Sequence, residues 1–288
     1  MVPIVITSVV IIGAVLTLFV LAGKQYSTFI EENKADFQFV FLAPASLYLI
    51  DKTKLIERLA GRLIVIQQRV AVLYMAGKAV PQYTKMFLAQ VVSSALICLL
   101  GGAVFALLGG GDKRFIVIGL ILALILPAIS IQKLGEKTTR RKQDIIFELP
   151  EFSSKVALLV NAGETVQKAI VRCTLMKQDN PNPLYKELGE AVTKIRNGES
   201  FGHVLEDFSK RCAVQEVSVF TTTILLNYRR GGDQLSLSLR ELSQGLWEKR
   251  KTISKTRGEE ASSKLVFPMV LIFVVVLVIV AFPALRIF

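Results

Sequence analysis

Four long apolar runs divide the 288-residue chain, at residues 2–22, 87–108, 115–131 and 265–285. A hydrocarbon core of about 30 Å is crossed by roughly 20 residues of α-helix. We therefore expect four membrane-spanning helices. The second and third are separated only by a short polar, glycine-rich turn at residues 109–114, so they should form a helical hairpin.

The first run has a rival interpretation, which is a cleaved signal peptide. No Lys or Arg precedes the run, and its apolar length is that of a full span. A signal peptide would have a basic start and a shorter apolar stretch. We favour an uncleaved helix.

A fifth apolar stretch, residues 37–50, is ambiguous. It contains Pro44 and is too short to cross a bilayer as a helix. We expect it to lie at the membrane interface or to pack on the hairpin. If it did cross, every later loop would change sides.

The distribution of charge predicts the orientation of the spans. The chain has 35 Lys+Arg against 23 Asp+Glu, a formal net charge of +12. The basic residues gather in residues 23–86, 133–142 and 249–264, whereas the hairpin turn and the C-terminal tail hold few. Cytoplasmic loops are enriched in Lys and Arg, so the N-terminus and the hairpin turn should face outward. This topology accounts for the basic balance, and we expect no nucleic-acid partner.

Residues 133–264 are long enough to form a domain, and their apolar residues recur at steps of three and four. No convincing alternation of period two is present, so the fold class should be all-α. Breaks at glycine and proline predict six helices, at residues 144–161, 164–177, 183–196, 200–212, 214–229 and 233–263. The last should run on into the fourth span, bent rather than stopped by Pro268.

Glycines close three of these helical patterns, at Gly163, Gly198 and the pair 231–232. We expect left-handed C-terminal caps there. An acidic residue follows each junction, at positions 164, 199 and 233, where it should lie in the first turn of the next helix.

Little in the sequence indicates enzymatic chemistry. The phosphate-binding pattern GxxxxGK[ST] is absent, and the three cysteines are far apart. His203, with Glu206 and Asp207 nearby, is more typical of a surface position than of an acid–base or metal site. No ionisable residue falls inside an expected span, which disfavours a transporter. We expect no enzyme activity, no cofactor and no metal.

Several short motifs, in this order and spacing, resemble the type II secretion system F domain. They are ELPEF at residues 148–152, AGETVQKAI at 162–170, NGESF at 197–201 and GGDQL at 231–235. The exit RGEEASSKLVFP at 257–268 looks like the TadB/TadC branch of that family. The resemblance covers residues 141–283, and the arrangement of spans extends it to the whole chain.

The resemblance implies a platform protein in the cytoplasmic membrane of a bacterium or archaeon. Such platforms work beneath a growing Tad-like pilus, type IV pilus or secretion pseudopilus, with a hexameric cytoplasmic ATPase and pilin subunits. Longer relatives carry two copies of the domain. This chain shows one copy, as TadB and TadC do, which suggests pairing with a paralogue and a homo- or hetero-oligomer.

We expect five segments in the chain. They are a first span at 1–22, a cytoplasmic helical segment at 23–86, the hairpin at 87–132, a cytoplasmic six-helix bundle of the F type at 133–264, and a last span with a short outer tail at 265–288.

The expected mechanism is mechanical, with the bundle docking on the ATPase and passing motion to the spans. Candidate docking residues are the acids at helix starts, Glu151, Glu164 and Asp233, together with Arg229 and Arg230. The alternative for Glu148 and Glu151, which share a helix face, is a solvated first turn. For the whole protein, a membrane-bound signalling or regulatory scaffold is the main alternative, and a transporter is the less favoured one.

Overall fold

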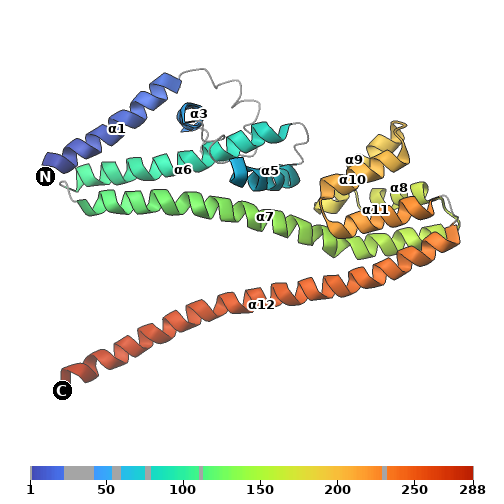
Figure 1. The fold of residues 1–288 in the computed structure, drawn as a ribbon. Coiled ribbons are helices and arrows are strands. Elements are labelled where there is room, and N and C mark those ends of the chain that lie inside the picture. The colour runs from blue at the N-terminus through green and yellow to red at the C-terminus, as the bar shows by residue number, and fades with distance from the viewer. Residues whose placement is uncertain are drawn as a thin grey trace. The chain divides into compact units, whose positions relative to one another are not determined.

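The computed structural model describes residues 2–22, 42–53, 60–74, 79–109, 113–228 and 232–287. The described residues are almost entirely helical, and no strand occurs among them. The helices are α1 (Val2–Ala22), α3 (Ala43–Lys52), α5 (Ala60–Tyr74), α6 (Val80–Leu108), α7 (Lys113–Asn161), α8 (Val166–Leu175), α9 (Pro183–Arg196), α10 (Phe201–Cys212), α11 (Gln215–Asn227) and α12 (Gly232–Ile287) (Figure 1). The all-α expectation is confirmed.

The chain forms two compact units, Met1–Arg141 and Lys142–Phe288, and the boundary between them falls inside α7. We refer to them as the first and second unit.

Four helices of the described chain are long and apolar enough to cross a membrane: α1, α6, α7 and α12. At most 22% of each apolar window is buried within the protein, and for α12 the share is 0%. Apolar side chains that the protein itself leaves uncovered are the pattern expected of helices surrounded by lipid. The four expected spans are therefore confirmed as helices.

In the first unit, α3 packs on the hairpin helix α6. Leu47 and Ile50 are fully buried with Leu88 and Ala89 in one apolar cluster. The Ser93 hydroxyl donates to the Ser46 hydroxyl at 3.0 Å. The ten residues of α3 are too few to span a bilayer, and residues 43–50 of this stretch pack on the hairpin helix α6; a position at the membrane interface stays a prediction. Positions 37–41 lie outside the described residues.

The hairpin helices α6 and α7 approach closely at a pair of glycines. A Cβ added to Gly102 would lie 2.8 Å from the Gly119 Cα, and one added to Gly119 would lie 2.8 Å from the Gly102 Cα. Only glycine permits two backbones to come this near. Small residues are the usual device for close helix packing within membranes.

The second unit is built around a single large apolar core, to which α7 to α12 all contribute side chains. Its largest fully buried members include Phe152, Phe208 and Phe220. The ring centroids of Phe152 and Phe220 are 5.9 Å apart in an edge-on arrangement, and Tyr185 meets Phe152 similarly at 6.3 Å. Edge-to-face pairs of this kind add to the stabilisation that burial provides.

Two helices, α7 and α12, extend well beyond the apolar core of the second unit. As expected, α12 continues through Pro268 into the last span. The expected separate start of a helix at residue 144 is wrong, because α7 runs without a break from Lys113 to Asn161. The change from apolar to polar side chains alters the surroundings of this helix but leaves its backbone hydrogen bonds intact. A proline inside a helix removes one such bond and kinks or breaks the helix, and here α12 continues through Pro268.

The junctions after α7 and α9 have the expected left-handed glycines, with φ of +92° at Gly163 and +86° at Gly198. Gly231 lies outside the described residues, and Gly232 begins α12. The acidic residues after Gly163 and Gly198 were expected in the first turn of the following helix, and for both junctions this expectation is wrong. Thr165 caps α8 by accepting from the Lys168 N–H at 3.4 Å, so Glu164 precedes the helix. Glu199 likewise precedes α10, which begins at Phe201.

Candidate partner-docking site

Glu151 lies in the interior of α7, not in a first turn, and both of its neighbouring cations come from the second unit. Its carboxylate is 2.8 Å from the Lys155 ammonium and 2.9 Å from the Lys177 ammonium. Lys177 also contacts Glu148 at 3.2 Å. Because Lys177 follows α8, these ion pairs tie the turn after α8 to the side of α7. The solvated first turn considered for Glu148 and Glu151 is therefore wrong.

The protonation of this cluster is set by its contacts. Hydrogen bonds from Lys155 and Lys177 lower the pKa of Glu151 to about 2. Burial opposes the charged form of Lys177, but its hydrogen bonds to Glu151 and Glu148 outweigh burial and raise its pKa. Burial raises the pKa of Tyr185 to about 12. The carboxylate of Glu151 is thus fully charged at neutral pH and already held by two cations.

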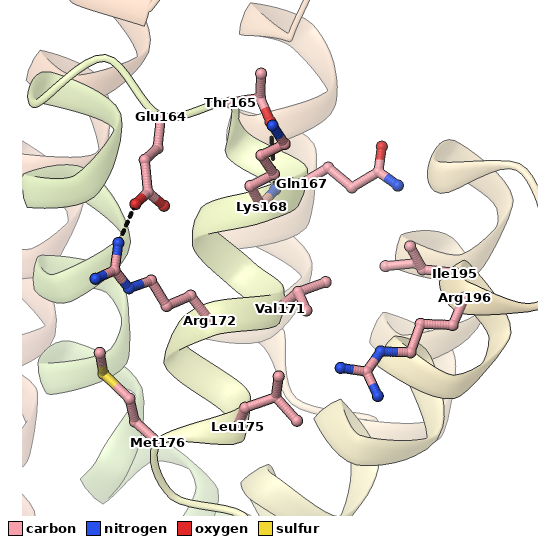
Figure 2. A pocket seen from close by; sticks show the side chains of 10 residues that line it. All are labelled: Glu164, Thr165, Gln167, Lys168, Val171, Arg172, Leu175, Met176, Ile195 and Arg196. Carbon is pink, nitrogen blue, oxygen red and sulfur yellow. Dashed lines mark hydrogen bonds and ion pairs between the residues drawn. The ribbon is translucent and has the colours of Figure 1, made fainter.

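Glu164 has a different setting, at the head of an open groove. Glu164 precedes α8, and its carboxylate forms an ion pair with the guanidinium of Arg172 on that helix (Figure 2). The groove encloses about 950 Å³ and runs beside α8 toward the end of α9. Figure 2 shows Gln167, Val171 and Leu175 pointing from α8 toward α9.

The floor and rim of this groove differ in chemistry. Its apolar lining is Val171, Leu175, Met176 and Ile195. Leu175 is 39% exposed and Met176 is 64% exposed, and Figure 2 shows them on different sides of α8. Its cations are Lys168, Arg172 and Arg196, set against the single carboxylate of Glu164 among the described lining residues.

The side chains of the remaining candidate residues lie outside the described part of the chain. Arg229 and Arg230 lie outside the described residues. Asp233 is the second residue of α12, so its position at a helix start is as expected, and its side chain lies outside the described part of the chain. Docking through any of these residues stays a prediction.

A network of charges between α9 and α10 was not identified from the sequence. Glu187 is completely buried, and its carboxylate accepts from the Arg211 Nε at 2.8 Å. Arg211 also pairs with Asp207, which in turn pairs with Lys194. The hydrogen bond from Lys194, then the charge of Arg211, lower the pKa of Asp207 despite some burial. The available signal was the position of Glu187 on the apolar face of α9, beside Leu188.

A second set of unpredicted contacts joins α12 to α7. The Arg257 guanidinium donates to Asp144 and to Gln143. The Arg250 guanidinium lies 3.9 Å from the centroid of the Phe147 ring and 4.8 Å from that of Trp247. Stacked guanidinium groups of this kind stabilise by about 0.5–1 kcal/mol at exposed sites.

The described residues offer no obvious catalytic or metal centre. No cluster of three or more His, Cys, Asp or Glu side chains suited to a metal ion occurs in the described ranges. His203 is exposed, and the carboxylate of Asp207 is already occupied by Lys194 and Arg211. Cys173 is buried, and its burial raises the pKa of the thiol, which leaves it protonated and unreactive at neutral pH.

Comparison with known families identifies one domain. Residues 152–283 match the family model described as type II secretion system (T2SS), protein F. No curated protein and no solved structure matches the chain. Proteins of this family are inner-membrane platform proteins of secretion and pilus systems, and they are generally not enzymes.

Proposed function

We propose, from the type II secretion system protein F domain at residues 152–283, that this protein is the inner-membrane platform of a fibre-assembling machine. The observation that carries the proposal is the position of the domain, which extends along α12 into an apolar window long enough to span a membrane. The fibre is a Tad-like or type IV pilus, or a secretion pseudopilus. The resemblance of residues 257–268 to TadB and TadC favours the Tad-like branch.

The mechanism that this architecture supports is mechanical. A cytoplasmic hexameric ATPase binds the second unit, and its nucleotide-driven movement is passed along α12 to the last span. An unbroken helix transmits displacement well because it has no loop to absorb it, and α12 is unbroken from Gly232 to Ile287. The spans then help to lift pilin subunits from the bilayer into the fibre.

The proposed orientation places the second unit in the cytoplasm and the N-terminus and C-terminal tail outside. It rests on the basic residues of 133–142 and 249–264, which flank the spans on the side of this unit. An alkaline phosphatase fused after the last residue should be active, and a green fluorescent protein fused there should be dark. The reverse pair of readings would overturn the orientation.

The chain carries one matched domain, so we propose that it pairs with a paralogous platform protein to complete the site for the ATPase. Docking by Glu164, Asp233, Arg229 and Arg230 is part of this proposal. Glu151 is the weakest member of the set, since a partner would have to replace its contacts with Lys155 and Lys177.

Co-purification tests the proposal directly. The full chain, co-expressed with the paralogue and solubilised in mild detergent, should retain the assembly ATPase of the same organism. The double variant Arg229→Glu/Arg230→Glu should lose most of it. The matched control Lys186→Glu/Lys210→Glu changes the net charge equally at two exposed positions of α9 and α10 and should retain it. Failure of the wild-type pair to retain any ATPase, with fibres unaffected by deletion of the gene, would contradict the platform function.

A further inference from the structure

A groove beside α8 and the end of α9 in the second unit is lined in part by exposed apolar side chains. Its apolar residues Leu175 and Met176 are exposed and lie outside the core, whereas Val171 packs against the core and is only partly covered by it. Apolar surface left in water costs about 25 cal/mol per Å², so a binding partner that covers it gains that free energy. Exposed apolar patches bordered by polar residues are typical of interaction sites.

The cations of the rim indicate the charge of that partner. Lys168 and Arg196 are exposed, and neither forms an ion pair with any described residue. Figure 2 shows Arg196 reaching from the end of α9 back toward α8, over the apolar lining. Lys168 and Arg196 therefore leave two positive charges, unpaired by any described residue, at the edges of the groove. These charges complement a partner segment that carries acidic residues on both sides of an apolar stripe.

The spacing of the groove fits a helical segment. Val171 and Leu175 are four residues apart on α8 and present one apolar ridge, with Ile195 opposite. An amphipathic helix lays residues spaced by three and four into a groove of this form.

The geometry points to a site at which the second unit binds an acidic amphipathic helix of a partner protein, with apolar side chains against Val171, Leu175 and Met176 and carboxylates against Lys168 and Arg196. The site does not depend on which protein carries that helix. It therefore stands apart from the platform function, which the co-purification of the ATPase tests separately.

The test uses the full chain in detergent and a fluorescein-labelled helical peptide of about 16 residues, with leucines on one face and glutamates beside them. Fluorescence anisotropy should show saturable binding. A peptide of identical composition, with the leucines scattered around the helix, should bind at least about tenfold more weakly.

The variants then locate the site. Lys168→Glu/Arg196→Glu should weaken binding at least about tenfold, and Leu175→Ser/Met176→Ser should do the same without loss of the fold, because both side chains are exposed. The control Lys186→Glu/Lys210→Glu should stay within about twofold of wild type. Circular dichroism and the emission of Trp247, the only tryptophan of the chain, verify folding.

Three outcomes would overturn the inference. The scattered peptide could bind as well as the ordered one, which would indicate charge attraction alone. The groove variants could bind like wild type, which would place the peptide elsewhere. Light scattering could show that the groove variants convert an oligomer of the wild-type chain into a monomer, which would make a second copy the occupant.

Discussion

The Arg257 guanidinium donates a hydrogen bond to the Asp144 carboxylate at 2.7 Å, and its Nε donates to the Gln143 side-chain oxygen at 3.2 Å. This pair joins α12 to the part of α7 that belongs to the second unit, and each of the two helices also contains an apolar window of spanning length. Both charged side chains are 36% exposed. The contact therefore contributes little to stability and is placed where it fixes one long helix against the other.

Arg257→Ala should separate these two roles. We expect a loss of at most about 1 kcal/mol in the free energy of unfolding, because the ion pair is half-exposed. Fibre assembly should fall much more, since Arg257 would no longer fix the alignment of α12 on α7, although the core and the Arg250 guanidinium over Phe147 still join the two helices. The measurements are Trp247 fluorescence during urea unfolding of the full chain and fibre counts by electron microscopy.

The control for that variant is Lys255→Ala, which removes an exposed pair with Glu259 within α12 alone. It should leave both measurements unchanged. The exchange Asp144→Arg/Arg257→Asp should restore part of the assembly. Normal fibre counts in Arg257→Ala would show that the contact is dispensable for force transmission.

The hairpin glycines offer a second prediction, with a neighbour as the control. Gly102→Ala should destabilise the full chain in detergent by about 1–3 kcal/mol, because its Cβ would meet the Gly119 backbone, which cannot move aside as a flexible side chain can. Gly101→Ala should cost nothing, since nothing lies within 4 Å of its added Cβ. The measurement is the temperature at which half of the protein still elutes as a folded peak after heating. Equal temperatures for the two variants would rule out a close contact at Gly102.

The ion pairs of Glu151 predict a dependence of stability on pH. Its pKa is lowered to about 2 in the folded protein, so the stabilisation is fully present above the ordinary pKa of about 4.5. It is lost as the pH falls from there through about 2. After allowance for solvent at this partly exposed group, we expect Glu151→Gln to cost about 1 kcal/mol at pH 7.

Unfolding of wild type and Glu151→Gln followed at a series of pH values tests this directly. The difference between them should shrink below pH 4.5 and vanish near pH 2. A difference that is constant across this range would mean that the amide variant perturbs packing and that the charge of Glu151 contributes nothing.

Ala213 provides a change that should stabilise the protein. It follows α10 with φ of 51° and ψ of 40°, a left-handed conformation that costs an alanine about 1–2 kcal/mol. Ala213→Gly removes that cost but gains entropy in the unfolded chain, so we expect a net stabilisation of up to about 1 kcal/mol. Gly198→Ala, at φ of +86° with nothing near its Cβ, is the reverse experiment and should destabilise by a similar amount. Thermal unfolding measures both, and a destabilised Ala213→Gly would contradict the argument.

The helix limits of the second unit were largely predictable because local signals set them. Gly163 and Gly198 adopt the expected positive φ, and α9 begins at Pro183 behind Asn182, whose side chain accepts from the Leu184 N–H at 2.9 Å. Ala213 carries no such signal, since alanine rarely adopts a left-handed conformation. The unbroken α7 was missed because charge marks a change of solvent around a helix and does not end it.

The contacts that define the candidate surface could not be read from local patterns. Lys168 and Arg196 come from different helices, and only the packing of α8 on α9 brings them to one groove. The same is true of Arg257 and Asp144, which are 113 positions apart. Glu187 is the exception, because a carboxylate on an apolar helix face requires a buried cation, and Arg211 is that cation.

Because α12 is one continuous helix, the rotation of its membrane end about the helix axis is fixed relative to its core end. Each residue of an α-helix turns the chain by about 100°, so the side of the last span that meets a given neighbour is fixed by the number of residues that separate it from the core. Leu246, the last buried core residue on this helix, and Leu265, the first of the expected span, are therefore locked in rotation as well as in distance. A single inserted residue between them would leave both ends folded and turn the span to present a different face.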